Sequence, residues 1–185
     1  MNFDFSEEQN LLRDQARKFL NDRSPPAAVR AVLEDDAASH DEELWQDMAR
    51  LGWVGTTIPE EYGGVGFSFL DLCVLVEEFG RSLVPGPFVP NQVCAGILMI
   101  HASDDQKSKY LPGLADGSVI HTYALTEESG RWDLEGIQLE AQKDGEDWVL
   151  NGIKLFVPDA NVADYLHVAA LKPDGGFGIF IVARE

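Results

Sequence analysis

Apolar side chains recur every three to four positions along the first part of the chain and at every second position along the last part. A period near 3.6 predicts helices that are buried along one face, and a period of two predicts half-buried strands. The change falls near Ser118. Helices followed by strands, in blocks, predict an α+β fold with a helical domain at 1–117 and a β domain at 118–185.

The helical part is expected to contain six helices, and three of them open with a capping box. In that motif a serine caps the helix and a polar side chain three residues later caps the serine in return. The serines are Ser6, Ser68 and Ser103. The expected helices are 6–23, 27–34, 41–51, 68–82, 91–101 and 103–111. Residues 35–40 read as a polar linker and the proline-rich 83–90 as extended chain, while Pro112 is expected to close the sixth helix.

The β part is expected to contain short strands joined by tight turns. The expected strands are 120–125, 137–142, 148–150, 154–157, 165–171 and 177–182. Asp144-Gly145 is a turn signal, and Asn151-Gly152 predicts a two-residue hairpin, because glycine and asparagine tolerate positive φ. The sequence stops three residues after the last of these strands, which would leave an unpaired sheet edge. We therefore expect either a fragment or an edge that another chain covers.

Charge and composition narrow the classes of function. The 185 residues carry a formal net charge of −18, with 45% hydrophobic and 25% charged residues. Binding to nucleic acid is disfavoured, because it needs clustered lysine and arginine. An acidic surface also gives an anionic substrate no long-range attraction. No apolar run is long enough to span a bilayer and no signal peptide is evident, so a cytoplasmic protein is expected.

The cysteines and histidines suggest no metal or redox centre. Cys73 and Cys94 stand alone in apolar helical segments and are expected to be buried free thiols. The four histidines, at 40, 101, 121 and 167, lack metal-ligand spacing. No glycine-rich phosphate loop and no nucleophile elbow occurs in the sequence.

Six short motifs, in order along the chain, resemble the acyl-CoA dehydrogenase family. They are D-F-S-E-E-Q at 4–9, I-P-E-E-Y-G-G at 58–64, E-E-F-G-R at 77–81, L-P-G-L-A-D-G at 111–117, A-L-T-E at 124–127 and L-N-G-I-K at 150–154. The resemblance covers almost the whole chain. It implies an N-terminal all-α helical bundle followed by an incomplete antiparallel β-barrel domain. It also implies FAD-dependent α,β-dehydrogenation of an acyl-CoA thioester, as in fatty-acid β-oxidation.

The resemblance implies which residues meet the cofactor. Leu125 and Thr126 match positions at the pyrimidine edge of the flavin, and Phe156 matches an aromatic position against its ring system. From the residues alone, Thr126 also reads as an ordinary strand residue and Phe156 as core packing. Glu127 reads as an acid that shapes its loop. The catalytic base of the family lies in a C-terminal helical domain, so none is assigned here, and the chain alone is expected to be inactive.

Three residues depart from the family pattern. Arg131 and Trp132 replace a glycine and a serine, and we expect both at the substrate-binding face. Arg131 suits a phosphate but also a solvated surface, and Trp132 fills space that a serine leaves open. Pro158 replaces a hydroxyl residue and has no N–H to donate.

The expected partners are acyl-CoA, an electron-transfer flavoprotein or similar acceptor, and further subunits of a homo- or hetero-oligomer. The departures leave an alternative open, a non-catalytic partner subunit of a heteromeric dehydrogenase with a degenerate flavin site. Nothing in the sequence separates the family from its acyl-CoA oxidase relatives.

Overall fold

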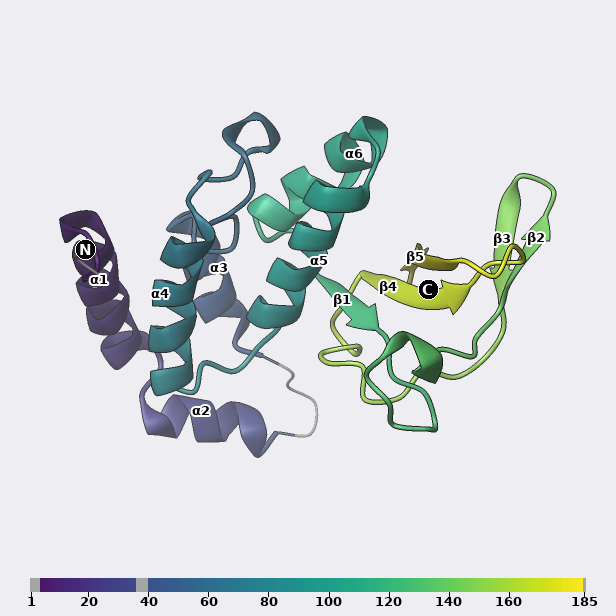
Figure 1. Ribbon diagram of the computed structural model, residues 1–185. Helices are drawn as coiled ribbons and strands as arrows, with labels where there is room; N and C mark the ends of the chain where they lie inside the picture. The colour runs from purple at the N-terminus through teal and green to yellow at the C-terminus, as the bar shows by residue number, and fades with distance from the viewer. Residues whose placement is uncertain (1–3, 36–39, 185) are drawn as a thin grey trace.

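The computed structural model describes residues 4–35 and 40–184. Six helices come first: α1 (Glu7–Arg23), α2 (Pro26–Leu33), α3 (Glu42–Arg50), α4 (Phe69–Arg81), α5 (Phe88–His101) and α6 (Asp104–Ala115). The strands are β1 (His121–Ala124), β2 (Ala141–Asp144), β3 (Asp147–Leu150), β4 (Tyr165–Leu171) and β5 (Phe177–Ala183). Two single-turn 3-10 helices are also present, η1 (Glu60–Tyr62) and η2 (Leu134–Gly136). Figure 1 shows the helices on one side of the molecule and the strands on the other, which confirms the predicted α+β class.

The predicted helix starts are confirmed where they depend on local capping. The side chains of Ser6, Ser68 and Ser103 each accept a hydrogen bond from the backbone three residues on, and each capping box is complete. These bonds satisfy backbone donors that a helix leaves free at its first turn. Of the predicted linker 35–40, residues 36–39 lie outside the described residues.

Two predictions that relied on proline were wrong. α5 begins at Phe88, inside the segment expected to be extended, with Pro90 in its first turn. A first-turn N–H has no partner within the helix, so proline costs little there. α6 continues through Pro112 to Ala115, because Leu111, Leu114 and Ala115 are buried in one core cluster. Burial of that face offsets the hydrogen bond that Pro112 cannot donate.

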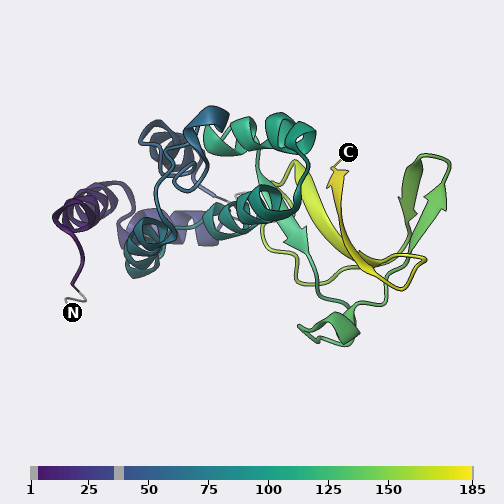
Figure 2. The same ribbon diagram turned by 45° about the horizontal axis from the view of Figure 1, so that its top comes forward.

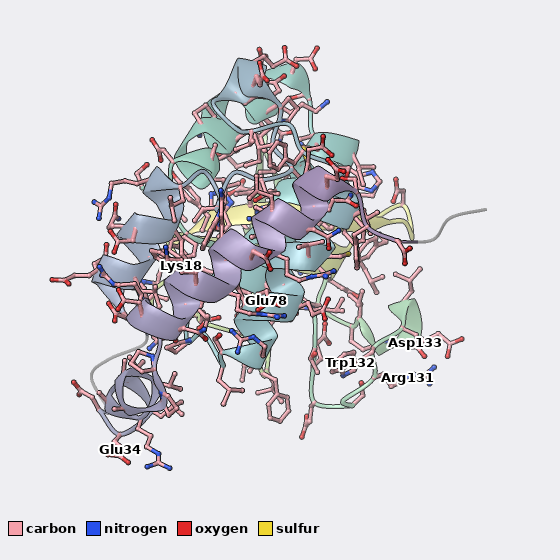
Figure 3. The ribbon with its side chains drawn as sticks, turned by 90° about the vertical axis from the view of Figure 1, so that its left-hand side faces the viewer. Lys18, Glu34, Glu78, Arg131, Trp132 and Asp133 are labelled. Atoms are coloured by element: carbon pink, nitrogen blue, oxygen red, sulfur yellow. The ribbon has the colours of Figure 1, made fainter. Side chains whose placement is uncertain are left out.

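The helical core lies between α1, α3, α4 and the start of α5. Leu20, Trp45, Leu75 and other side chains of this cluster are almost fully buried. α4 contributes Leu72, Val74, Leu75 and Phe79, while Cys73 is exposed, which corrects the expectation that it would be buried. Glu78 is also buried on α4, where α1 passes over it (Figure 3), and Arg17 and Arg81 donate hydrogen bonds to its carboxylate.

The strands form two small sheets. The first has the order β1-β4-β5, and the second is the hairpin β2-β3. β4 and β5 pair antiparallel from Tyr165 opposite Ala183 to Leu171 opposite Phe177, but β1 pairs with β4 in parallel. The sheet is therefore mixed rather than purely antiparallel, and it is not closed. In Figures 1 and 2 the hairpin stands at the end of the molecule farthest from the helices.

The predicted strand at 137–142 forms only in part. Ile137, Leu139 and Ala141 are buried and alternate with exposed residues as predicted, but β2 begins only at Ala141. The backbone N–H groups of Gln138 and Leu139 donate to the carboxylate of Glu127 instead of to a neighbouring strand.

The hairpin predicted at Asn151-Gly152 is absent from the described structure, and residues 154–157 form no strand there. After β3 the chain runs beside residue 126, where the N–H of Leu155 donates a hydrogen bond of 2.8 Å to the carbonyl of Thr126. The turn predicted at Asp144-Gly145 is confirmed, since Gly145 has a φ of 61° and joins β2 to β3.

Candidate functional site

Two segments that lie far apart in the sequence come together after β1. Residues 125–127 follow the end of β1, and residues 153–156 follow β3. The hydrogen bond from Leu155 N to Thr126 O joins them directly. Thr126 and Phe156, which the sequence resemblance singles out, therefore lie on adjacent stretches of backbone.

The hydroxyl of Thr126 and the ring of Phe156 interact little with the other described residues. Thr126 is half-buried, and within residues 4–35 and 40–184 its hydroxyl has no hydrogen-bond partner. Phe156 is 87% exposed and has a φ of 53°, in the left-handed region that few residues with a side chain adopt. A free hydroxyl and a bare aromatic ring are thus presented on paired segments. These are groups that can bind the polar edge and the flat face of a ring system.

Glu127 is held in a closed set of hydrogen bonds. Its carboxylate accepts from the N–H groups of Gln138 and Leu139 and from the ammonium of Lys154, which lies 2.7 Å away. The Glu127 and Lys154 side chains are 12% and 7% exposed. Burial alone would raise the pKa of Glu127, but the hydrogen bonds from Lys154 and the two backbone amides lower it overall. Glu127 is therefore an ionised acid that shapes its loop.

Two backbone carbonyls in or near these segments also accept hydrogen bonds from side chains. The carbonyl of Leu125 accepts a second hydrogen bond from Lys154, at 3.2 Å. Pro158 has no N–H, and its carbonyl accepts the hydroxyl of Thr122 at 2.6 Å. The position at which the sequence resemblance implies a hydroxyl thus offers no donor here.

Arg131 and Trp132 lie on the loop that follows Glu127, at the lower right of Figure 3 and away from α1. Arg131 forms ion pairs with Asp133 at 2.7 Å and Glu135 at 2.6 Å. The hydrogen bond and charge of Asp133, together with Glu135, raise the pKa of the Arg131 guanidinium. A phosphate at Arg131 would compete with two carboxylates of the same loop. Trp132 forms no ion pair with any residue that the structure describes, and it is 85% exposed.

Two hollows flank the Glu127–Lys154 pair. One, of about 390 Å³, is bordered by Glu127, Leu139 and Ile153. The other, of about 530 Å³, is bordered by Lys154 and by apolar side chains of β1, β4 and β5, among them Ala124, Val168 and Val182. Glu127 borders the first hollow and Lys154 the second, and Leu139 and Gly152 border both.

A buried histidine pair lies on β1 and β4 beside α5, and no motif or spacing in the sequence predicts it. Nδ1 of His121 and Nε2 of His167 are 2.9 Å apart, and His121 N donates to Asn91 of α5. Burial lowers the pKa of His121 to about 3, helped by its neighbour His167, whose own pKa burial lowers to about 4. The two histidines are 46 positions apart, and only the pairing of β1 with β4 brings them together.

The described residues contain no cluster of three or more histidine, cysteine or acidic side chains that would hold a metal ion. Over the same ranges no helix is long and apolar enough to cross a membrane. Lys154 is part of the L-N-G-I-K motif at 150–154, but the sequence predicts no role for it. The signal that marks it as part of the site is a lone cation between Ile153 and Leu155 in a strongly acidic chain.

Comparison with known proteins identifies the family. Residues 6–118 match the model of the acyl-CoA dehydrogenase N-terminal domain, and residues 122–185 match that of the acyl-CoA dehydrogenase middle domain. Isovaleryl-CoA dehydrogenase of Pongo abelii is 32% identical over 97% of this chain and 44% of its own length.

Solved structures agree with the family models. A variant of the steroid ACAD Tcur3481-Tcur3483 is 38% identical with a TM-score of 0.86, over 96% of this chain and 48% of that one. The ChsE4-ChsE5 complex of Mycobacterium tuberculosis is 28% identical with a TM-score of 0.85, over 99% of this chain and 49% of that one. The chain spans less than half the length of these relatives. It belongs to the acyl-CoA dehydrogenase family.

Proposed function

We propose that this chain provides the helical domain and part of the middle domain of a flavin-dependent acyl-CoA dehydrogenase, divided near Ser118. The proposed reaction is the α,β-dehydrogenation of an acyl-CoA thioester. FAD, when bound, supplies the acceptor for the hydride. The observation that carries the proposal is the unused hydroxyl of Thr126 beside the exposed ring of Phe156, on two hydrogen-bonded segments.

Each residue of this pair has a defined task in the proposal. The Thr126 hydroxyl can both donate and accept a hydrogen bond, which suits the pyrimidine edge of a flavin. Leu125 supplies backbone at the same edge, and Phe156 covers one face of the ring system. Pro158 contributes no donor, so binding depends more heavily on these three residues.

We place the catalytic base outside residues 1–185. A base must accept a proton from the substrate, and Glu127, the acid next to Thr126 in the sequence, already accepts from Lys154 and two backbone amides. Its pKa is lowered rather than raised, which disfavours proton uptake. Trp132 and Arg131 are proposed to contact acyl-CoA, with Arg131 released from its carboxylate partners when it does so.

A flavin-binding measurement tests the proposal directly. The purified full chain is titrated with FAD while flavin fluorescence is followed, and the Phe156→Asn variant is titrated in parallel. Asparagine tolerates the left-handed conformation, so this variant keeps the backbone and removes only the ring. We expect FAD to bind the unaltered protein and to bind the variant about tenfold or more weakly, as loss of one aromatic contact and its buried area predicts. Equal affinity for both proteins would refute the role of Phe156.

A second candidate function is a non-catalytic partner subunit of a heteromeric dehydrogenase. Trp132 and Pro158 favour it, since each removes a small or hydroxyl-bearing group from the site. Two similar solved structures are also named as pairs, ChsE4-ChsE5 and Tcur3481-Tcur3483. In this alternative the chain binds little FAD alone and associates with a second dehydrogenase subunit. A purified protein with stoichiometric FAD and no second subunit would exclude it.

The remaining partners follow from the same proposal. We propose a homo- or hetero-oligomer that passes electrons to an electron-transfer flavoprotein or a similar acceptor. Because the catalytic base is placed outside residues 1–185, the flavin absorbance of the FAD-loaded chain alone should not bleach when an acyl-CoA is added under anaerobic conditions. Bleaching of stoichiometrically bound flavin by the chain alone, at any acyl-CoA length, would contradict the placement of the base outside these residues.

A further inference from the structure

Lys154 connects the two segments of the candidate site through its buried side chain. Its ammonium donates to the carbonyl of Leu125 at 3.2 Å and to the carboxylate of Glu127 at 2.7 Å. Those two acceptors belong to the residues on either side of Thr126. Lys154 itself lies two positions before Phe156. One buried cation therefore fixes both neighbours of the free hydroxyl and the segment that carries the exposed ring.

The surroundings leave Lys154 few other arrangements. Its side chain is 7% exposed, and turning the ammonium to solvent would break its hydrogen bonds to both Leu125 and Glu127. The segment that carries it passes tightly over Leu139, since a Cβ on Gly152 would lie 2.6 Å from Cδ1 of that leucine. Glu127 in turn anchors Leu139 and Gln138 through their backbone N–H groups. Three stretches of chain thus meet at this one ion pair.

We propose that Lys154 is a positioning residue that holds Thr126 and Phe156 in the geometry that receives the flavin. The inference rests on the proposed function and adds to it a residue that acts on the cofactor only through others. Loss of the Lys154 ammonium would free the Leu125 carbonyl and leave the Glu127 carboxylate buried without its cation. The 125–127 segment would then loosen, and its hydrogen bond to Leu155 would open more often.

The test separates positioning from flavin binding by measuring both. Backbone amide exchange is followed in the flavin-free full chain and in the Lys154→Met variant, which keeps the apolar length of the side chain. We expect the Leu155 amide to exchange about tenfold or more faster in the variant, as loss of a charge-assisted hydrogen bond predicts. Amides in α1–α6 should keep their protection. Unchanged protection at Leu155 would overturn the proposal whether or not the protein binds flavin.

The flavin titration is the second readout. Under conditions where every protein is folded, Lys154→Met should weaken FAD binding about tenfold or more. Arg23→Met is the matched control, because it breaks an ion pair of 2.6 Å with Asp47 in the helical domain. It should leave FAD affinity unchanged. Faster exchange at Leu155 with no change in FAD affinity would overturn the positioning role. Absence of FAD binding by the unaltered protein would instead count against the proposed function.

A double variant distinguishes positioning from simple charge neutralisation. Glu127→Gln combined with Lys154→Met removes the buried charge of both partners and keeps a side-chain oxygen that can accept from the Leu139 amide. The Leu125 carbonyl still lacks its donor. We expect exchange at Leu155 to stay fast and FAD binding to stay weak in the double variant. Full recovery of both would mean that Lys154 only neutralises Glu127, and the proposal would fail.

Discussion

Acidification should destabilise this protein well above the pH at which its carboxylates titrate, because of the buried pair His121 and His167. The two imidazoles are 0% and 2% exposed, and Tyr110 and Tyr165 pack against the ring of His121. In the unfolded chain each imidazole has an ordinary pKa near 6.5, whereas in the folded protein the values fall to about 3 and about 4. The unfolded state therefore binds protons first, and stability is lost as the pH falls below about 6.5.

The magnitude follows from these pKa values. Between about pH 7.5 and about pH 5.5, each histidine should lower the free energy of unfolding by about 1.4 kcal/mol, or roughly 2.7 kcal/mol for the pair. Carboxylates with lowered folded pKa values contribute little over this interval, whereas burial raises the pKa of Asp159, which acts in the opposite direction as the pH falls. Glu78 and Glu127, for example, have folded pKa values that are lowered from an ordinary 4.5, so their contribution is lost only at more acidic pH.

Urea unfolding, followed by the fluorescence of the buried Trp45 and Trp53, measures the effect at the two pH values. The double variant His121→Phe with His167→Phe keeps aromatic rings and removes both titrating groups, so its stability should change little over the same interval. The exposed His101 provides the control, because His101→Gln should preserve the full pH dependence. A loss below about 1 kcal/mol in the unaltered protein, or an equal loss in the double variant, would refute the reasoning.

The remaining predictions concern the helical domain. Glu78→Gln should lower the free energy of unfolding by roughly 2 kcal/mol in a urea titration, because the buried carboxylate loses charge-assisted bonds to two arginines. The exposed Glu77→Gln should change the free energy of unfolding by less than about 0.5 kcal/mol. Equal effects of the two substitutions would contradict the role of the buried ion pairs. Gly64→Ala should destabilise by about 3 kcal/mol or more, since the new Cβ would lie 2.0 Å from a backbone carbonyl oxygen. Gly63→Ala meets open space and should cost only the left-handed strain of its φ of 85°, about 1–2 kcal/mol, so a similar or larger loss there would count against the steric argument. Burial raises the pKa of Cys94 to about 12, so iodoacetamide at neutral pH should label one thiol per folded chain and two after unfolding; rapid labelling of both would contradict its burial.

The elements that could be predicted from the sequence are those whose signals are local. The capping boxes at Ser6, Ser68 and Ser103 need only residues three positions apart, and all three formed. The Asn151-Gly152 signal is equally local, yet no hairpin formed there. The N–H of Leu155 and the ammonium of Lys154 instead bond to residues 126 and 127, which are too far away in the sequence for a local turn rule to include them.

The candidate site divides in the same way. The motifs in sequence order predict that the segments of Thr126 and Phe156 belong together, and the structure joins them by a hydrogen bond. The pairing of Glu127 with Lys154, and that of His121 with His167, depends on how strands and loops pack. No sequence motif or spacing predicts that the members of either pair lie in contact.

The energetic cost of Phe156 argues that this part of the chain is built to bind something. A left-handed conformation costs a residue with a side chain about 1–2 kcal/mol, and a ring that is 87% exposed recovers almost nothing through burial. In contrast to the exposed ring, the side chains of the neighbouring Lys154 and Glu127 are buried and pair with each other. Stability alone would favour glycine or asparagine at 156. A buried ionic framework that holds an unfavourable, exposed aromatic ring is understandable when the ring gains its contact area from a bound partner.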